Sequence, residues 1–249
     1  QVHWYNDLKS VGTINCGVIF TNELLDALPF HRVVGDSNGL KELYVGVDDT
    51  DSSGGFIDII GEPSTTALND YFTSLDIELA EAQVGEVSLN ALDWIIEAGS
   101  ILKSGFVVTI DYGLAASELY SQDREEGTLL CHYRHTINDE PYKLVGLQDI
   151  TAHVDFTSVV RAGLSAGLEV SGFTNQLSFL MGLGIGEELM AVTDDPELSL
   201  RAIAHNQSIK GLIMPGGAGE NFKVLVQHKG IDEPKLSGFS FRDKKDILQ

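Results

Sequence analysis

The sequence predicts an α/β fold in which helices cross over between the strands of a parallel sheet. Three short apolar segments, rich in Val, Ile and Phe, have the composition of buried strands: Val18–Phe20, Phe106–Ile110 and Val224–Gln227. A helical pattern separates the first two, and the order strand, helix, strand is typical of a parallel sheet with helical crossovers. The 249 residues, 43% of them hydrophobic, suit one domain of ordinary size or a domain with one large excursion.

The crossover helix is predicted over residues 92–102. Apolar residues recur there at helical spacing and would form one face: Leu92, Ile95, Ile96 and Leu102. Ser88 or Asn90 can cap the start, and Gly105 marks the end.

Residues 32–63 interrupt this order and predict a small antiparallel β excursion. The segments "HRVV", "LKELYVGV" and "GFIDII" have strand composition and are joined by "GDSNG" and "DDTDSSGG", which are turn sequences. Helical spacing returns at Leu68–Leu79.

Residues 112–160 are irregular and polar, and we expect a long loop on the substrate side. Loops of this length in a compact domain are usually functional. Beyond it, 164–175 reads as a helix end running into a strand, "QLSFLMGLGI" as a helix with a glycine stop, and "NFKVLVQHK" as a last strand.

The charge balance restricts the partners. Sixteen basic and 37 acidic residues give a formal charge of −21, whereas nucleic-acid binding normally needs a basic surface. A basic, guanidinium-bearing partner fits this balance better. The apolar runs are shorter than the ~20 residues of a membrane helix, and two cysteines indicate no disulfide framework. We therefore expect a cytoplasmic protein that binds neither nucleic acid nor membrane.

Two apparent motifs carry no function. "GLGIG" at 182–186 follows a helical segment, whereas a dinucleotide-binding glycine motif follows a strand and opens a helix. Cys131, His132, His135 and His153 match no closed zinc pattern, so no metal site is predicted.

Several longer motifs resemble the MidA-like family of S-adenosylmethionine-dependent methyltransferases. They are "TNELLDALPFHR", "VVTIDYG", "GTLLCHYRH", "GLQDITAHVDF", "TNQLSFLMGLGI" and "FKVLVQHKG", and the likeness runs along nearly the whole chain. The resemblance implies a Rossmann-like sheet, S-adenosyl-L-methionine as cofactor, and methyl transfer to a protein arginine. An arginine-bearing subunit of a respiratory complex is one such partner. The oligomeric state, including a homodimer, is open.

One departure from the family pattern concerns the cofactor cradle. Such enzymes begin with a strand and a glycine-rich turn, and nothing similar precedes Cys16. We therefore expect residues 1–249 to be the carboxyl-terminal part of one methyltransferase domain.

The predicted site lies where the strands end, because ligands of open α/β sheets bind beyond the carboxyl ends of the strands. Phe20, Thr21 and Asn22 would reach the cofactor. The catalytic candidates are Asn22, Glu23, Asp26 and His153. Glu23 is the first choice, and Asp26 the second, for the carboxylate that holds the guanidinium through paired hydrogen bonds. On a helical turn Glu23 and Asp26 would lie on neighbouring positions. His153 could relay a proton, or pair with Asp155 to brace the loop. The substrate-binding candidates are Asp111, Tyr112, Gly113, Tyr133, Arg134, Asp149 and Asp155.

The acid excess and the missing cradle leave a second hypothesis open. The chain could be an assembly or binding factor that holds a basic segment of a partner, with weak catalysis or none.

Overall fold

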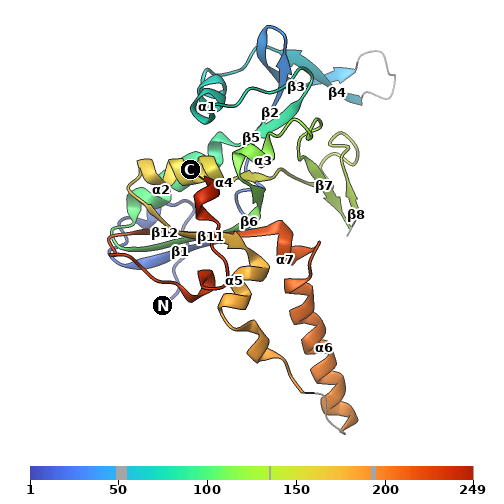
Figure 1. The fold of residues 1–249 in the computed structure, drawn as a ribbon. Coiled ribbons are helices and arrows are strands. Elements are labelled where there is room, and N and C mark those ends of the chain that lie inside the picture. The colour runs from blue at the N-terminus through green and yellow to red at the C-terminus, as the bar shows by residue number, and fades with distance from the viewer. Residues whose placement is uncertain (49–54, 135, 192–194, 249) are drawn as a thin grey trace. The chain divides into compact units, whose positions relative to one another are not determined.

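The computed structural model describes residues 1–48, 55–134, 136–191 and 195–248, and its ribbon is drawn in Figure 1. Residues 49–54 of the predicted β excursion and residue 135 of the predicted loop lie outside the described part. The chain forms two compact units. The first unit comprises Gln1–Glu23, Ile95–Gly113 and Val160–Gln249, and the second comprises Leu24–Trp94 and Leu114–Val159.

A mixed sheet with strand order β1-β6-β12-β11 forms the centre of the first unit. The strands are β1 (Gly17–Asn22), β6 (Gly105–Leu114), β12 (Phe222–Lys229) and β11 (Glu169–Asn175). β1 and β6 are parallel, with Gly17 opposite Gly105, as the strand–helix–strand order predicts. β12 runs antiparallel to both of its neighbours. All three strands predicted from short apolar runs are therefore confirmed.

Helices connect these strands. The crossover helix α2 (Leu89–Ile101) confirms the prediction, and the others are α4 (Phe156–Ser165), α5 (Gln176–Gly182), α6 (Pro196–Ile213) and α7 (Ala218–Asn221). Short 3₁₀ helices lie at Lys9–Val11, Ile185–Glu188, Ser237–Phe239 and Lys245–Leu248. Lys229 ties α2 to the residue that follows α4, because its Nζ donates to Gly99 O and Ala166 O at 2.7 Å each.

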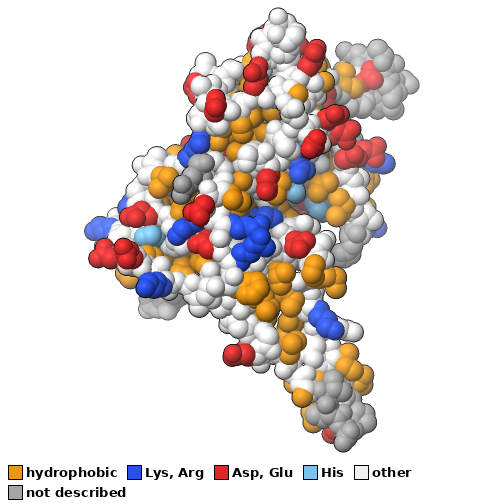
Figure 2. Space-filling view, in the orientation of Figure 1, with side chains coloured by type: hydrophobic (Ala, Val, Ile, Leu, Met, Phe, Trp, Pro, Cys, Tyr) orange, Lys and Arg blue, Asp and Glu red, His pale blue; other side chains and the backbone are white. Residues whose placement is uncertain are grey.

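Capping residues define the two ends of α5 and the start of α6. Asn175 caps α5 by accepting a hydrogen bond from Ser178 N, and Gly184 beyond its end has φ 84, a left-handed conformation that favours glycine. The predicted glycine stop is confirmed. Asp195 caps α6 by accepting from Glu197 N and Leu198 N. Figure 2 shows hydrophobic side chains gathered over α5 and α7 on the visible face.

The second unit contains a four-stranded antiparallel sheet with order β4-β3-β2-β5. Its strands are β2 (His31–Asp36), β3 (Gly39–Asp48), β4 (Gly55–Gly61) and β5 (Val84–Val87). The first three confirm the predicted β excursion. Helix α1 (Ala67–Leu75) stops four residues earlier than predicted, because Asp76 takes a left-handed conformation with φ 56. A buried apolar cluster joins the sheet to α1 and α3 (Ala116–Leu119): Val33, Leu68, Tyr71, Phe72, Leu79, Val87, Ala116, Leu119 and Tyr120.

The expectation of an irregular loop over 112–160 is wrong in part. This segment contains β10 (Val154–Asp155) and a three-stranded sheet of order β8-β7-β9: β7 (Leu130–Tyr133), β8 (Thr136–Asn138) and β9 (Asp149–Thr151). Strands of three or four residues are too short to show an alternating pattern, and β9 pairs with β7 across an intervening loop. Within the described residues, no helix has both the length and the apolar composition to cross a bilayer.

Candidate functional site

The carboxyl ends of β1 and β6 meet at one edge of the first unit's sheet. Asn22 lies opposite Ile110 in the parallel register, and Glu23 N donates to Ile110 O at 3.0 Å. The chain therefore stays bound to β6 through Glu23, at the edge where ligands of open α/β sheets bind.

The segment that follows β1 is a turn. The expectation that Glu23 and Asp26 share a helical turn is wrong: residues 23–28 form bends and a turn, and Leu28 N donates to Leu25 O at 3.3 Å. Pro29 disfavours a helical conformation in the residue before it. The segment between β1 and Pro29 is also too short for its hydrogen bonds to offset the free-energy cost of helix nucleation. Glu23 has φ 51, a left-handed conformation that is uncommon for residues other than glycine.

Asn22 and Glu23 present their side chains to solvent. Asn22 Nδ2 donates to Glu23 Oε1 at 3.0 Å, so the amide orients the carboxylate. Phe20 is 62% exposed and lies on the same face of β1 as Asn22, because side chains two residues apart in a strand share a face. Thr21 points to the other face, is buried, and donates through Oγ1 to Val108 O at 3.4 Å.

Asp111, Tyr112 and Gly113 lie inside β6, which continues to Leu114. The strand extends this far because β12 keeps pairing with it, Tyr112 opposite Phe222. β6 therefore continues past the predicted strand end at Ile110, into the segment that was expected to be an irregular loop. Asp111 is fully buried, and its Oδ1 accepts from Tyr112 N at 2.9 Å.

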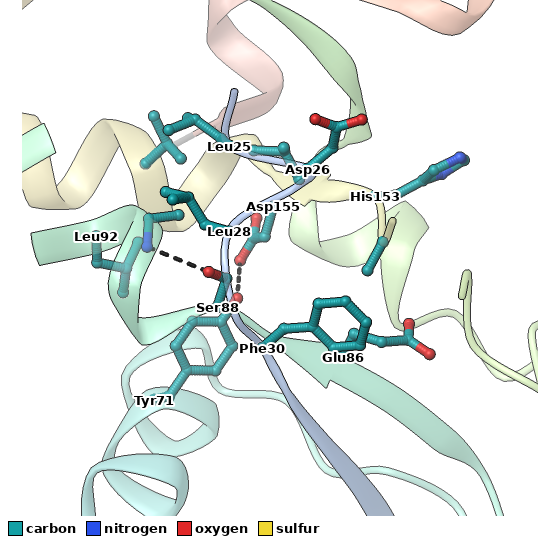
Figure 3. Close-up of a pocket in the computed structure, with 14 residues that line it drawn as sticks. Leu25, Asp26, Leu28, Phe30, Tyr71, Glu86, Ser88, Leu92, His153 and Asp155 are labelled. Atoms are coloured by element: carbon teal, nitrogen blue, oxygen red, sulfur yellow. Dashed lines mark hydrogen bonds between the residues drawn. The ribbon is translucent and has the colours of Figure 1, made fainter. Parts of the chain in front are cut away.

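A narrow cavity in the second unit brings together Asp26, His153 and Asp155 (Figure 3). Its volume is ≈ 20 Å³, room for about one water and too little for a guanidinium group. In Figure 3 the Asp26 carboxylate and the His153 ring extend away from Tyr71, whereas the Asp155 carboxylate points toward the Tyr71 hydroxyl.

Asp155 braces the start of α4. Its Oδ1 accepts from Thr157 N at 2.9 Å, and its Oδ2 accepts from Ser158 Oγ at 2.5 Å and from Tyr71 Oη at 2.6 Å. Burial raises the pKa of this carboxyl, although the hydrogen bonds that it accepts act in the opposite direction. Asp155 therefore has a bracing role through Thr157, Ser158 and Tyr71, whereas the pairing of His153 with Asp155 stays a prediction.

Glu86 is a buried acid that the sequence analysis missed. It lines the same cavity, and its Oε2 accepts from Thr128 N at 2.8 Å and from Thr128 Oγ1 at 2.9 Å. Burial raises the pKa of Glu86. Thr128 also connects the acid to the predicted loop, because Thr128 Oγ1 accepts from His153 N at 3.0 Å. The signal in the sequence is a glutamate inside the apolar run "VGEV".

The remaining substrate-binding candidates belong to the small β8-β7-β9 sheet of the second unit, except Arg134, which directly follows β7. The Arg134 guanidinium lies 5.1 Å from the centre of the Tyr133 ring, a cation–π contact. Asp149 is exposed and lies opposite His132.

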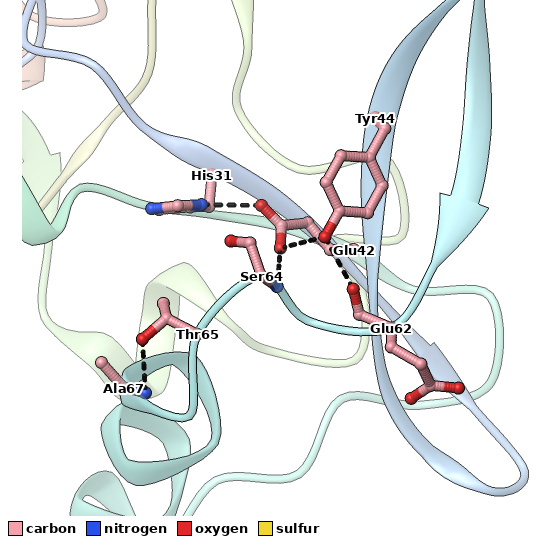
Figure 4. Close-up of polar contacts among 7 residues, drawn as sticks. All are labelled: His31, Glu42, Tyr44, Glu62, Ser64, Thr65 and Ala67. Carbon is pink, nitrogen blue, oxygen red and sulfur yellow. Dashed lines mark hydrogen bonds and ion pairs between the residues drawn. The ribbon is translucent and has the colours of Figure 1, made fainter.

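A second polar network of this unit surrounds Glu42 (Figure 4). Its Oε1 lies 2.7 Å from His31 Nδ1, and its Oε2 accepts from Ser64 N at 2.5 Å and from Tyr44 Oη at 3.1 Å. Burial acts to raise the pKa of Glu42, but the hydrogen bonds from His31, Ser64 and Tyr44 together lower it to about 2.

Comparison with known proteins identifies the family. Residues 1–174 match the model of a family described as putative S-adenosyl-L-methionine-dependent methyltransferases, and the chain belongs to this family. Its α/β fold is that of these methyltransferases, and S-adenosyl-L-methionine is the family's cofactor.

Two solved structures from Burkholderia thailandensis share the fold. One is a COG1565 superfamily protein bound to S-adenosyl-homocysteine, with a TM-score of 0.82 and 32% identity over 94% of this chain and 58% of that one. The other is a native COG1565 superfamily protein, with a TM-score of 0.83, 32% identity and coverage of 94% and 60%.

Curated relatives are more distant in sequence. The protein arginine methyltransferase NDUFAF7, mitochondrial, of Danio rerio is 26% identical over 90% of this chain, and that of Rattus norvegicus is 27% identical over 92%. The chain spans about half the length of these relatives, 50% in each case.

Proposed function

We propose that this protein is an S-adenosyl-L-methionine-dependent methyltransferase that acts on an arginine of a protein partner. The family membership supports methyl transfer, and the names of the two NDUFAF7 relatives support arginine as the acceptor. The excess of acidic residues, with a formal charge of −21, suits a cationic acceptor.

The exposed face of β1 fits part of the cofactor. Phe20 offers an uncovered aromatic ring, and Asn22 on the same face offers an amide that can donate and accept hydrogen bonds. The adenosyl group needs both an apolar surface and polar contacts. Thr21, which is buried and bonded to β6, is the least suited of the three predicted cofactor-binding residues.

The conformation of Glu23 is the observation that carries the proposal. An exposed glutamate is held with φ 51 at the end of β1, its N–H bound to β6 and its carboxylate bound by Asn22. A left-handed conformation costs a non-glycine residue roughly 1–2 kcal/mol. Such strain at a ligand-binding edge is typical of functional residues.

The carboxylate of Glu23 suits a guanidinium acceptor. The cofactor supplies an electrophilic methyl group when bound. Arginine stays protonated in proteins and is a poor nucleophile, so the protein's task is to hold and orient it. Glu23 would accept two parallel hydrogen bonds from the guanidinium, which fixes its plane and draws positive charge away from the attacking nitrogen. Positioning of this kind can contribute roughly 7–11 kcal/mol.

Labelled methyl transfer tests the proposal. The protein is incubated with S-adenosyl-L-methionine carrying a labelled methyl group and with a cell extract, and the labelled protein is digested and sequenced by mass spectrometry. We expect the label on an arginine side chain. Label on lysine, on a small molecule or nowhere would contradict the proposed acceptor.

His153 remains a proposed proton acceptor in this reaction. It lines the cavity of the second unit, and its backbone is fixed by Thr128. If His153 relays the proton, His153→Asn should remove a limb near neutral pH from the pH dependence of kcat, which a purely structural role would not do.

The alternative is an assembly factor that holds a basic segment without methylating it, which the charge of −21 favours. Isothermal titration with S-adenosyl-L-methionine separates the two functions. Binding of the cofactor supports the enzyme, and an absence of binding heat together with retained capture of a basic peptide supports the assembly factor.

A further inference from the structure

Strand β4 is the edge strand of the second unit's sheet, and no strand among the described residues pairs with its outer side. It is the last strand in the order β4-β3-β2-β5, and Figure 1 shows it as the outermost strand of that sheet. Every second residue of such a strand directs its N–H and C=O away from the sheet, where they can pair with another strand.

Four side chains of β4 are apolar and exposed, two on each face of the sheet. Phe56 and Ile60 are 43% and 63% exposed, and Ile57 and Ile59 are 39% and 48% exposed. Val45 and Val47 extend the first of these faces from β3, opposite Asp58 and Phe56. Soluble proteins usually protect an edge of this kind with charges, prolines or a covering element.

The sequence of β4 is symmetric about its centre. In "GFIDIIG", Asp58 stands in the middle, with isoleucines on either side, then Phe56 and Ile60, and glycines at the ends. A closed dimer has a twofold axis, so each residue of one copy must meet its counterpart on the other. We propose that β4 pairs antiparallel with β4 of a second copy of this chain, with the twofold axis at Asp58.

In this register each apolar side chain of β4 faces an apolar side chain of the second copy. Phe56 faces Ile60 of the second copy, and Ile57 faces Ile59 of the second copy. Apolar cross-strand pairs of this kind stabilise strand pairing. A shift by one residue would place isoleucine opposite Asp58, so the symmetric register is also the one that keeps the acids off the apolar side chains.

The two Asp58 residues would be the one like-charge pair on the axis. Each is already compensated within its own copy, because Asp58 Oδ1 accepts from Arg32 Nη1 at 2.6 Å and also from the Tyr142 hydroxyl. The remaining opposition comes from the net charge of −21 on each copy. Salt screens such repulsion, so the dimer should become tighter as ionic strength rises.

Sedimentation of the full chain between roughly 1 and 100 μM at physiological salt tests the pairing. We expect a dimer, weakened at least about tenfold by Ile59→Lys, since a lysine on an edge strand opposes pairing. Leu200→Lys is the matched control: Leu200 is 69% exposed on α6, and its substitution should leave the dimer unchanged. A wild-type monomer throughout this range, or equal effects of the two lysines, would overturn the proposal.

Disulfide trapping tests the register. In a Cys16→Ser background, the variant Ile57→Cys/Ile59→Cys should form a covalent dimer linked between positions 57 and 59, because opposed residues of antiparallel strands lie within disulfide reach. Ile57→Cys alone faces isoleucine and should stay unlinked. Efficient linkage by Ile57→Cys alone, or a non-covalent dimer that the double variant cannot link, would show that the strands do not pair about Asp58.

Discussion

Replacement of Glu42 by glutamine tests how the β excursion is held to the start of α1. Glu42 is 5% exposed and accepts hydrogen bonds from Ser64 N and Tyr44 Oη beside its contact with His31. Its pKa falls from an ordinary 4.5 to about 2, which corresponds to about 3 kcal/mol of stabilisation at pH 7. Because the folded-state pKa lies below the unfolded value, this contribution is present above pH 4.5 and is lost as the pH falls toward 2.

Urea unfolding of the wild type and Glu42→Gln at several pH values measures this contribution. We expect the variant to lose about 2–3 kcal/mol at pH 7, and the difference between the two proteins to shrink to under about 1 kcal/mol near pH 2. Glu62→Gln is the control, since Glu62 pairs with Lys41 but its side chain is 80% exposed, so its loss should stay below about 1 kcal/mol. A pH-independent difference, or equal losses for both variants, would refute the reasoning.

Three further substitutions probe packing and helix ends through urea unfolding. Gly35→Ala should lower the free energy of unfolding by about 3 kcal/mol, because a Cβ there would lie 2.1 Å from Ala80 O. Gly211→Ala is the control and should cause no loss, since the space around Gly211 is open. Equal losses would contradict the steric argument. Lys229→Met should lower the free energy of unfolding by about 2 kcal/mol, because Gly99 O and Ala166 O lose their donor. Lys235 is exposed, and Lys235→Met is the control. A loss in Lys229→Met no greater than in the control would contradict this role of Lys229. Tyr71→Phe should cost about 2 kcal/mol by removing a hydrogen bond to buried Asp155, and unchanged stability would show that Asp155 is held without it.

Elements with a strong local signal could be predicted from the sequence. The buried strands β1, β6 and β12 are short runs of Val, Ile and Phe, and the crossover helix α2 has a clear apolar face. Glycine stops and turn sequences also placed the end of α5 and the strands of the β excursion. In each case the local preference and the tertiary structure agree.

Elements that depend on distant pairing could not be predicted in this way. The β8-β7-β9 sheet consists of very short strands, and the helix expected after β1 gives way to a turn held by Ile110 of β6. α6 carries a local start signal, Asp195 followed by proline, that the sequence analysis overlooked.

The candidate site also has a part with a local sequence signal and a part that depends on distant segments. The exposed pair Asn22 and Glu23 follows from a strand ending in polar residues. Tyr71, Asp155 and Glu86 line one cavity but come from three distant segments, and only the fold brings them together.

The rate of methyl transfer by Glu23→Gln tests the central claim most directly. Glu233→Gln is a matched control, since Glu233 is also an exposed glutamate of the first unit with positive φ, at 40°. If Glu23 holds the guanidinium, its replacement should lower kcat by about 10²-fold with cofactor affinity unchanged, whereas Glu233→Gln should retain the wild-type rate. Equal rates for the two variants would contradict the account.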